Sequence, residues 1–243
     1  MQDVYRMASL VAARDTTVLI TGPTGSGKEL IARALHQLSA RGSHTLAVVN
    51  CAAIPETLLE AELFGYARGA FTGALQSYAG RIQAAHLGTL FLDEIGDMPL
   101  SLQPKLLRFL EQKELQRLGS TQVVRVDTRV VAATNADLLT LVRQGKFRED
   151  LYYRLCAFPL AIPPLAERPG DVIQLAAHFL EKFSSSSPTP VLSEEAAALL
   201  LAQSWPGNVR ELQNVMERAL ILCDGEEVVR PAHLMLWDNG LRG

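Results

Sequence analysis

Residues Gly22 to Glu29 read GPTGSGKE and separate an apolar stretch, TTVLIT, from a helical pattern. A strand that enters a glycine-rich turn and then a helix is the setting in which such a turn binds phosphate groups. Glycines let backbone N–H groups close around the phosphate oxygens, and the helix N-terminus adds positive potential. The pattern predicts an ATP-binding loop in which Lys28 reaches the β- and γ-phosphates. Its residues are Gly22, Pro23, Thr24, Gly25, Ser26, Gly27, Lys28 and Glu29.

One position departs from the common form of this loop. Glu29 stands where a serine or threonine usually ligates Mg²⁺. The segment TLFLDE, which starts at Thr89, is an apolar strand that ends in Asp93 and Glu94. Such an end lies at the carboxyl edge of a sheet, where α/β proteins bind ligands. We expect Asp93 to hold Mg²⁺, directly or through water, and Glu94 to act as general base on the attacking water; a pair of solvated loop acids is the alternative.

Two asparagines end other predicted strands. Asn135 follows RVVAAT, and Asn50 ends LAVVN. Each is placed to touch the γ-phosphate or to position the attacking water. A turn or helix-capping role fits an asparagine at such a position equally well.

Apolar runs alternate with helical patterns up to about residue 165, which predicts parallel strands joined by helices. The runs are nearly continuous, as in strands covered on both faces. The expected strands are 17–21, 46–50, 89–92, 129–134 and 158–162. The expected helices are 28–40, 101–112 and 137–144, and the second has a buried stripe of Leu102, Leu106, Leu107 and Leu110.

Only helical patterns follow Pro163-Pro164, over about 170–183, 193–203 and 208–223. The fold prediction is a parallel α/β nucleotide-binding subdomain, 1–165, followed by a small all-helical lid subdomain, 166–243. Residues 184–190 form a flexible connection. Ser193 is placed to cap the helix after it, and Asn208 and Glu211 have capping-box spacing.

The hexapeptide GAFTGA, Gly69 to Ala74, lies between the phosphate loop and the acidic strand end. Nucleotide handling does not require an aromatic residue and a hydroxyl at this point. Small residues on both sides of Phe71 and Thr72 indicate a mobile loop that presents these two groups to a partner. Taken alone, the hexapeptide also fits a hairpin tip with a buried phenylalanine.

Two arginines, Arg148 and Arg154, lie in the segment FREDLYYRL. On a regular helix they would point about 240° apart, so both face one site only if the helix is broken. A local interpretation pairs Arg154 with Asp150 and leaves Arg148 in solvent. A functional one makes at least one an arginine finger for a neighbouring subunit. Arg210, at a helix start after WPGN, is placed to reach the nucleotide from the lid.

The composition limits the class of protein. The 243 residues are 48% hydrophobic and carry a net charge of −3, which gives no general attraction to DNA or to anionic membranes. No apolar run approaches the ~18 residues of a membrane span. Three scattered cysteines without metal-ligand spacing fit reduced thiols in a cytoplasm.

The order of the motifs resembles one family. GPTGSGKE, GAFTGA, GTLFLDE, ATN, FREDLYYRL and WPGNVREL are similar to the central AAA+ domain of bacterial sigma-54-dependent transcriptional activators, the enhancer-binding proteins. The resemblance extends over about residues 2 to 236, and GAFTGA is its most specific element. Glutamate after the lysine is usual in that family. An N-terminal regulatory domain and a C-terminal helix-turn-helix, which such activators usually carry, are not in this sequence.

The resemblance implies roles for particular residues. The loop of Gly69, Ala70, Phe71, Thr72, Gly73 and Ala74 would engage sigma-54, with support from a second loop near 117–125. Asn50 would couple Glu94 to that loop by sensing the γ-phosphate. Arg148 and Arg154 would act in trans across a ring interface, and Arg210 would be the lid sensor. Hexameric rings, with dimers as an inactive form, are also implied.

From these motifs and the resemblance we expect an ATPase that depends on Mg²⁺ and remodels the closed complex of sigma-54 RNA polymerase. We expect no specific DNA binding by this segment. Two alternatives remain at this stage. One is a regulatory module whose assembly responds to nucleotide and which hydrolyses it poorly. The other is a different AAA+ machine, such as a helicase loader or a chelatase subunit. The target genes and the activating signal are not encoded here.

Overall fold

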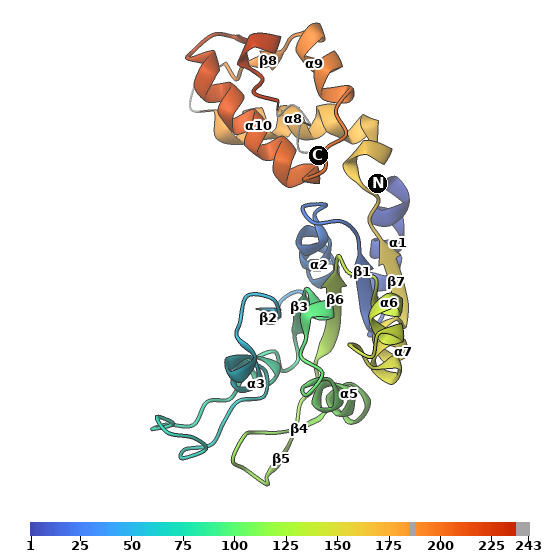
Figure 1. The fold of residues 1–243 in the computed structure, drawn as a ribbon, viewed down its shortest axis with the longest axis vertical. Helices are drawn as coiled ribbons and strands as arrows, with labels where there is room; N and C mark the ends of the chain where they lie inside the picture. The colour runs from blue at the N-terminus through green and yellow to red at the C-terminus, as the bar shows by residue number, and fades with distance from the viewer. Residues whose placement is uncertain (185–187, 237–243) are drawn as a thin grey trace. The chain divides into compact units, whose positions relative to one another are not determined.

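The computed structural model describes residues 1–184 and 188–236. The chain divides into two compact units (Figure 1): Gln2–Gly22 with Lys28–Ile162, and Pro163–Gly243 with Pro23–Gly27 and Met1. Residues 185–187 of the expected connection, and residues 237–243 at the end of the expected lid, lie outside the described residues.

A five-stranded parallel sheet is the centre of the first unit, in the order β2-β3-β6-β1-β7. Val18 of β1 lies opposite Val131 of β6 and Phe158 of β7. All residues of β6 are buried, as expected of a strand that helices cover on both faces. The parallel sheet is thus confirmed, with strand ends at most one residue from those predicted. The strands are β1 (Val18–Thr21), β2 (Leu46–Asn50), β3 (Thr89–Asp93), β6 (Arg129–Thr134) and β7 (Phe158–Ala161).

Helices flank this sheet (Figure 1). In α5 the predicted stripe is largely right, since Leu102, Leu106 and Leu110 are buried. Leu107 is only partly buried, and Phe109 fills the core position beside it. Three helices were predicted, over 28–40, 101–112 and 137–144, and they form with slightly shorter bounds as α2 (Lys28–Gln37), α5 (Gln103–Gln112) and α6 (Leu138–Arg143). Four more complete the layer: α1 (Gln2–Ala12), α3 (Glu56–Phe64), α4 (Arg81–Ala84) and α7 (Glu149–Leu155).

The second unit is mainly helical. Its own apolar core contains Trp205, Leu212 and Met216, each at most 2% exposed. The Ser193 hydroxyl accepts a hydrogen bond from Ala196 N at 3.1 Å, which confirms the predicted cap. The elements are α8 (Pro169–Phe183), β8 (Val191–Leu192), α9 (Glu194–Leu201), α10 (Asn208–Cys223) and β9 (Val228–Val229).

The start of α10 differs from the prediction. Asn208 is the first helical residue, and Gly207 occupies the cap position. The Glu211 carboxylate accepts from Gly207 N at 2.8 Å, so the reciprocal bond of the predicted capping box is displaced by one residue. The Asn208 side chain is used elsewhere: its Oδ1 accepts from Leu165 N at 2.8 Å, and its Nδ2 donates to Thr24 O at 3.1 Å. The predicted Asn208–Glu211 capping box is therefore wrong.

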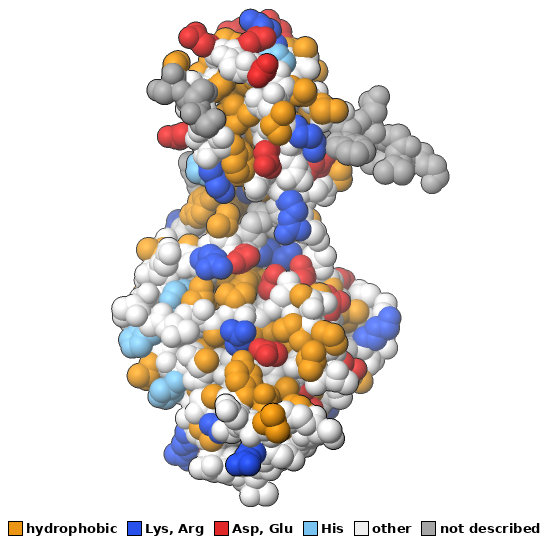
Figure 2. Space-filling model, turned by 90° about the vertical axis from the view of Figure 1, so that its left-hand side faces the viewer, with side chains coloured by type: hydrophobic (Ala, Val, Ile, Leu, Met, Phe, Trp, Pro, Cys, Tyr) orange, Lys and Arg blue, Asp and Glu red, His pale blue; other side chains and the backbone are white. Residues whose placement is uncertain are grey.

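Charged side chains are mixed over the face drawn in Figure 2, with Lys and Arg next to Asp and Glu. No extended area of one charge is visible on that face. Within the described ranges, every helix is too short or too polar to cross a membrane.

Two irregular segments pack together beside α5. The turn from Gly65 to Gly80 closes through a bridge between Tyr66 and Tyr78, and Tyr66 also bridges to Leu118. Leu118 lies in the turn of an antiparallel hairpin, which pairs β4 (Glu114–Gln116) with β5 (Val123–Arg125). The predicted output loop and its supporting loop are therefore neighbours in the structure.

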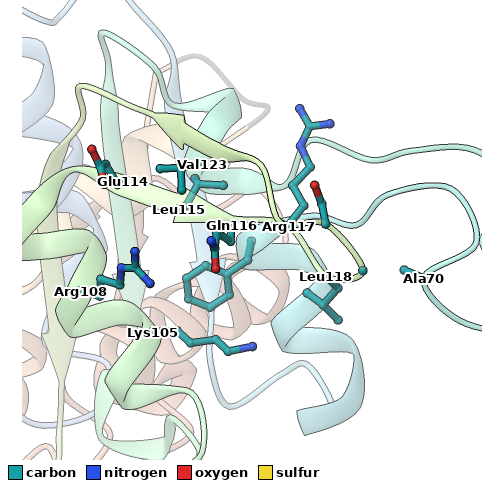
Figure 3. A pocket seen from close by; sticks show the side chains of 12 residues that line it. Ala70, Lys105, Arg108, Glu114, Leu115, Gln116, Arg117, Leu118 and Val123 are labelled. Atoms are coloured by element: carbon teal, nitrogen blue, oxygen red, sulfur yellow. The ribbon is translucent and has the colours of Figure 1, made fainter.

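A cavity of about 470 Å³ lies at this junction. In Figure 3, Lys105 and Arg108 line it from α5, Leu118 lines it from the hairpin turn, and Ala70 approaches from the other segment. A Cβ on Gly119 would stand 2.7 Å from the Cβ of Ala70, and Gly119 has a φ of +70°. Only glycine fits this contact without displacing the neighbouring loop.

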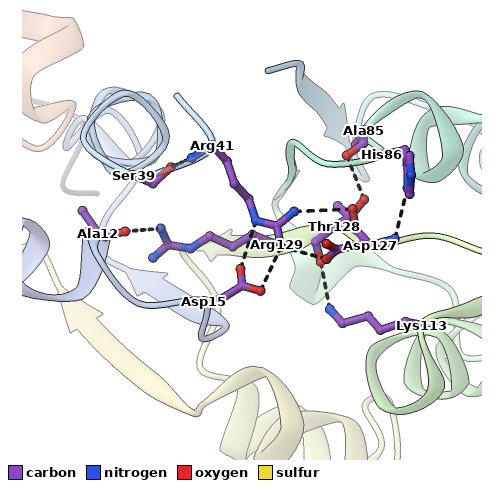
Figure 4. A network of polar contacts seen from close by, with 10 residues as sticks. All are labelled: Ala12, Asp15, Ser39, Arg41, Ala85, His86, Lys113, Asp127, Thr128 and Arg129. Atoms are coloured by element: carbon purple, nitrogen blue, oxygen red, sulfur yellow. Dashed lines mark hydrogen bonds and ion pairs between the residues drawn. The ribbon is translucent and has the colours of Figure 1, made fainter. Parts of the chain in front are cut away.

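A polar network fixes the end of the sheet at which the strands begin (Figure 4). Arg41 forms ion pairs with Asp15 at 2.9 Å and with Asp127, just before β6, at 2.7 Å. Arg129, the first residue of β6, is 2% exposed. Its guanidinium donates to the carbonyl oxygens of the last two residues of α1, at 2.9 and 2.8 Å. These contacts tie α1 and the loop after α2 to the start of the central strand.

Candidate nucleotide-binding site

The predicted phosphate loop joins β1 to α2, as the strand–turn–helix pattern requires. Lys28 opens α2, is only 6% exposed, and donates from Nζ to Gly22 O at 3.1 Å. Gly25 and Gly27 have φ values of +75° and +102°, a region that favours glycine. The lysine ammonium therefore lies at a helix N-terminus, where both contribute positive potential.

The two acids at the end of β3 have different surroundings. Glu94 adopts a left-handed backbone conformation, with φ 48° and ψ 52°. Its Oε1 is 3.4 Å from Lys28 Nζ, and its Oε2 accepts from Asn135 N at 3.0 Å. A left-handed conformation in a non-glycine residue costs free energy, and such residues concentrate at functional sites. The bend turns Glu94 towards the lysine of the phosphate loop.

Asp93 faces the neighbouring strand. Asn50 is its register partner on β2, and Asn50 Nδ2 donates to Asp93 Oδ2 at 3.3 Å. The same amide accepts from Ala52 N and Ala53 N through Oδ1, both at 3.0 Å. Asn50 thus has the turn role left open above, and its amide nitrogen also reaches the acid pair.

Electrostatics at this edge favour a cation. Burial raises the pKa of Asp93 above its usual value, and the adjacent Glu94 raises it further. No group of three or more His, Cys, Asp or Glu side chains among residues 1–184 and 188–236 is arranged to hold a metal alone. Asp93 therefore fits an ion that it shares with phosphate oxygens, as Mg²⁺ is commonly bound at nucleotide sites. Glu29 pairs instead with Arg33 at 2.7 Å.

The unit that contains the lid also contains the tip of the phosphate loop. Arg210, in the first turn of α10, lines a cavity of about 220 Å³ with Thr24 and Gly207. Ser26 Oγ is buried and has no hydrogen-bond partner in the described part of the chain. A buried hydroxyl without a partner is costly, and a polar ligand in the loop can satisfy it.

The two arginines of FREDLYYRL are separated by a helix boundary. Arg148 lies just before α7, in extended backbone, so the break required for both to face one site is present. Arg148, not Arg154, pairs with Asp150, at 2.6 Å, because its extended backbone lets the guanidinium fold back onto that carboxylate. The predicted Arg154–Asp150 pair is therefore wrong. Arg154 donates to Leu110 O at 3.0 Å.

The hexapeptide forms a tight, exposed loop. Gly69 and Gly73 have φ values of +80° and +101°, and Gly69 N donates to Ala74 O at 2.9 Å. Phe71 is 46% exposed, and its ring lies edge-on to that of Tyr66, with centroids 5.0 Å apart. Phe71 is therefore not a core residue, and the alternative of a hairpin tip with a buried phenylalanine is wrong.

Some groups that hold these loops were not found from the sequence. Tyr66 supports Phe71, and the buried Arg168 donates to Ser26 O at 3.0 Å from 142 positions away. The Asn208 side chain donates to the carbonyl oxygen of Thr24, which lies 184 positions earlier in the sequence. Local patterns do not reveal contacts of this range.

The fold is of the AAA+ class. Residues 1–161 match the family described as "Sigma-54 interaction domain", and residues 166–236 match "AAA+ ATPase lid domain". The chain belongs to the sigma-54 interaction domain family. This confirms the resemblance and the fold class.

The curated relatives include a transcriptional activator and a regulatory protein. The chain is 52% identical over 230 residues to the DNA-binding transcriptional activator HyfR of Escherichia coli K12, covering 94% of this chain and 34% of HyfR. It is 51% identical over 227 residues to the regulatory protein AtoC of the same organism, covering 93% of this chain and 49% of AtoC. It thus spans a third to a half of these relatives.

A solved structure extends the likeness. NtrX of Brucella abortus in complex with ADP has a TM-score of 0.89 and 36% identity, over 96% of this chain and 52% of that one. The same protein in complex with ATP has a TM-score of 0.87 and 37% identity, over 96% of this chain and 54% of that one.

Proposed function

We propose that this chain is the ATP-hydrolysing motor domain of a sigma-54-dependent activator, and that it remodels the closed complex of sigma-54 RNA polymerase so that the promoter can melt. One observation carries the proposal. Lys28, Asn50, Asp93 and Glu94 converge on one edge of the sheet, and the same unit presents the exposed Gly69–Ala74 loop.

ATP would bind with its phosphates on the loop from Gly22 to Glu29 and with Lys28 on the β- and γ-phosphates. Phosphate oxygens compete with Glu94 for Lys28, because the two side chains are only 3.4 Å apart. Glu94 released in this way acts as the general base on water. Asn50 and Asn135 contact the same pair of acids, which supports a role for both in reporting the γ-phosphate.

Asp93 would hold Mg²⁺ together with the phosphate oxygens. When bound, the ion neutralises the charge that develops on the transferred phosphoryl group. From the lid, Arg210 would contact the nucleotide.

Assembly into a ring, a hexamer with an inactive dimeric form, would complete the site. Arg148 and Arg154 lie on a segment separate from the acid pair, and we assign them to the site of a neighbouring subunit. An arginine finger of this kind contributes ~10³–10⁵ in rate in other phosphate-loop enzymes. Arg148 is half-exposed and has only to exchange Asp150 for a phosphate.

The output is assigned to the loop of Gly69, Ala70, Phe71, Thr72, Gly73 and Ala74, which would bind sigma-54. Its position is proposed to follow the γ-phosphate through Asn50 and Glu94, as an order–disorder switch. The 1–165 subdomain would carry this loop, and the 166–243 subdomain would act as the lid. We assign the protein to the cytoplasm, and its regulation and DNA binding to other parts of the activator.

Mixing two inactive variants tests the shared site. Glu94→Gln lacks the base but keeps its arginine, and Arg148→Ala lacks the arginine but keeps its base. We expect each ring alone to hydrolyse ATP at least ~100-fold more slowly than wild type. Their mixture should regain activity where an intact Glu94 meets an intact Arg148 from its neighbour.

Two results would overturn the proposal. The first is wild-type protein without turnover at any concentration, as a nucleotide-responsive assembly module would behave. The second is activity in the mixture no higher than in the separate variants, although both form rings by light scattering.

A further inference from the structure

The tip of the phosphate loop is held by the lid. Residues Pro23–Gly27 fall in the same compact unit as Pro163–Gly243, apart from the β1 and α2 segments that flank them in sequence. A Cβ on Gly25 would lie 2.4 Å from Gly207 O, so the loop and the start of α10 are in direct contact inside this unit.

Three consecutive carbonyl groups of the phosphate loop accept hydrogen bonds from residues of the lid. Asn208 Nδ2 donates to Thr24 O at 3.1 Å, and Arg168 Nη2 donates to Ser26 O at 3.0 Å. Between them, Gly25 O accepts from the backbone nitrogen of Val209 at 3.0 Å. The two side-chain donors are 2% and 8% exposed, so solvent cannot easily replace them.

Each donor is itself fixed in place. Asn208 has a φ of +54° and accepts from Leu165 N through Oδ1 at 2.8 Å. Arg168 pairs with Asp171 at 3.4 Å. A left-handed asparagine is kept only where its surroundings require it. The lid therefore presents preoriented donors rather than mobile side chains.

The carbonyl bonds have a consequence for the N–H groups. In a planar trans peptide the C=O and the following N–H point in opposite directions. Holding Thr24 O and Ser26 O on the lid side therefore directs the N–H groups of Gly25 and Gly27 the other way. Backbone N–H groups of such a loop are what cradles phosphates.

We propose that Arg168 and Asn208 are positioning residues for nucleotide binding, which preform the phosphate cradle by fixing its carbonyl groups. The inference rests on the proposed function, because it concerns the same phosphate loop. Ser26 Oγ, buried without a hydrogen-bond partner in the described residues, is the kind of group that a bound phosphate would satisfy. Preorganisation of this kind raises affinity because less ordering is left for the ligand to impose.

The test measures ADP binding, which needs no hydrolysis, by titration and by the ADP-induced rise of the melting temperature. Arg168→Met removes the donor to Ser26 O. Asn208→Asp keeps the acceptor for Leu165 N but loses the donor to Thr24 O. We expect the Kd for ADP to rise about 10- to 100-fold in each variant, as for the loss of a hydrogen bond to a charged or buried group. Arg168→Lys, which retains one donor, should recover part of the affinity.

Trp205→Phe is the matched control. It removes a buried lid donor whose acceptor, Leu200 O at 3.0 Å, is not in the phosphate loop. The variant should melt earlier in the absence of ligand and still bind ADP as wild type does. At saturating ATP, we expect Arg168→Met to retain most of kcat and to show the defect in KM.

Either of two outcomes would overturn the inference. In the first, Arg168→Met and Asn208→Asp bind ADP within about twofold of wild type. In the second, Trp205→Phe loses as much affinity as they do, which would make lid packing the cause. Wild-type protein that binds no ADP would instead contradict the proposed function itself.

Discussion

At the N-terminal ends of the strands, charged groups are held firmly. Arg41 contacts Asp15 and Asp127 at 2.9 and 2.7 Å, and the buried Arg129 donates to two carbonyl groups of α1 at 2.8 and 2.9 Å (Figure 4). Each of these contacts joins segments that are far apart in the sequence. The contacts at this end of the sheet therefore stabilise the folded structure.

At the C-terminal ends, the contacts between side chains of neighbouring segments are longer. Lys28 is 3.4 Å from Glu94, and Asn50 is 3.3 Å from Asp93. Both distances exceed those of close charge-assisted hydrogen bonds. Glu94 also adopts a left-handed backbone conformation. Lys28 also donates to Gly22 O at 3.1 Å, and Glu94 accepts from Asn135 N at 3.0 Å. We expect a bound nucleotide to exchange the longer contacts among these groups for its own.

The difference indicates that the ion pairs that stabilise the fold and the polar groups proposed to act on nucleotide lie at different ends of one sheet. Pairs at the first end should matter for stability and not for rate, whereas groups at the second should matter for rate and not for stability.

The largest expected effect is on turnover. Glu94→Gln should lower kcat ~10²–10⁴-fold, because the general base is lost, while ATP binding and the unfolding midpoint remain close to wild type. Asp127→Asn, at the other end, should lower the free energy of unfolding by no more than about 1 kcal/mol and leave kcat unchanged. ATPase rates and urea unfolding should be measured on the same two preparations. If both variants lost turnover, or both lost stability, the two ends of the sheet would not differ in role.

A smaller effect concerns the buried arginine. Arg129→Met should cost about 2–3 kcal/mol in the free energy of unfolding, because two α1 carbonyl groups lose their donors inside the protein. Arg125→Met is the control, since Arg125 has an 86% exposed side chain and pairs with Glu114 on the hairpin; it should cost under about 1 kcal/mol. Equal costs for the two arginines, measured by denaturant unfolding, would remove the distinction between framework and surface pairs.

The smallest effect depends on pH. His36 is 5% exposed and lies 2.9 Å from the hydroxyl of Thr89, the first residue of β3. Burial lowers the pKa of His36 from its ordinary value, so the folded state disfavours the charged form. Below about pH 6.5 the unfolded chain therefore binds a proton that the folded chain refuses, and stability falls as pH decreases.

Between pH 7 and 5.5 the free energy of unfolding should therefore fall, by less than the limit of ~1.4 kcal/mol per pH unit for one proton. His36→Gln should remove this fall. If unfolding free energies of the variant and of wild type changed in parallel with pH, His36 would not be the group responsible.

The sequence predicted the sheet and the positions of the phosphate loop and the acid pair well, because these depend on local patterns. Apolar runs identified the strands, the glycine-rich turn identified the loop at Lys28, and the acids at 93 and 94 follow directly from a strand end. The Ser193 cap was also predictable, because its bond spans a single turn.

Most of the features that the sequence did not predict depend on contacts between residues far apart in the chain. Asn208 has the spacing of a helix cap, but its amide holds Thr24 and Leu165 instead, and both partners are far away in sequence. Arg148 took the partner expected for Arg154 because the helix begins one residue after it. Helix α1 and the β4–β5 hairpin also went unpredicted; the hairpin strands are short, and the hairpin turn pairs with the distant Tyr66 through Leu118.

Loop function is the central claim, and capture of sigma-54 tests it most directly. Purified sigma-54 would be incubated with the protein and ADP–aluminium fluoride, comparing wild type, Thr72→Ala and the control Ser77→Ala, which lies just beyond the loop. We predict capture by wild type and by Ser77→Ala, none by Thr72→Ala, and equal ATPase activity in all three. Capture of sigma-54 by Thr72→Ala at the wild-type level would contradict the account.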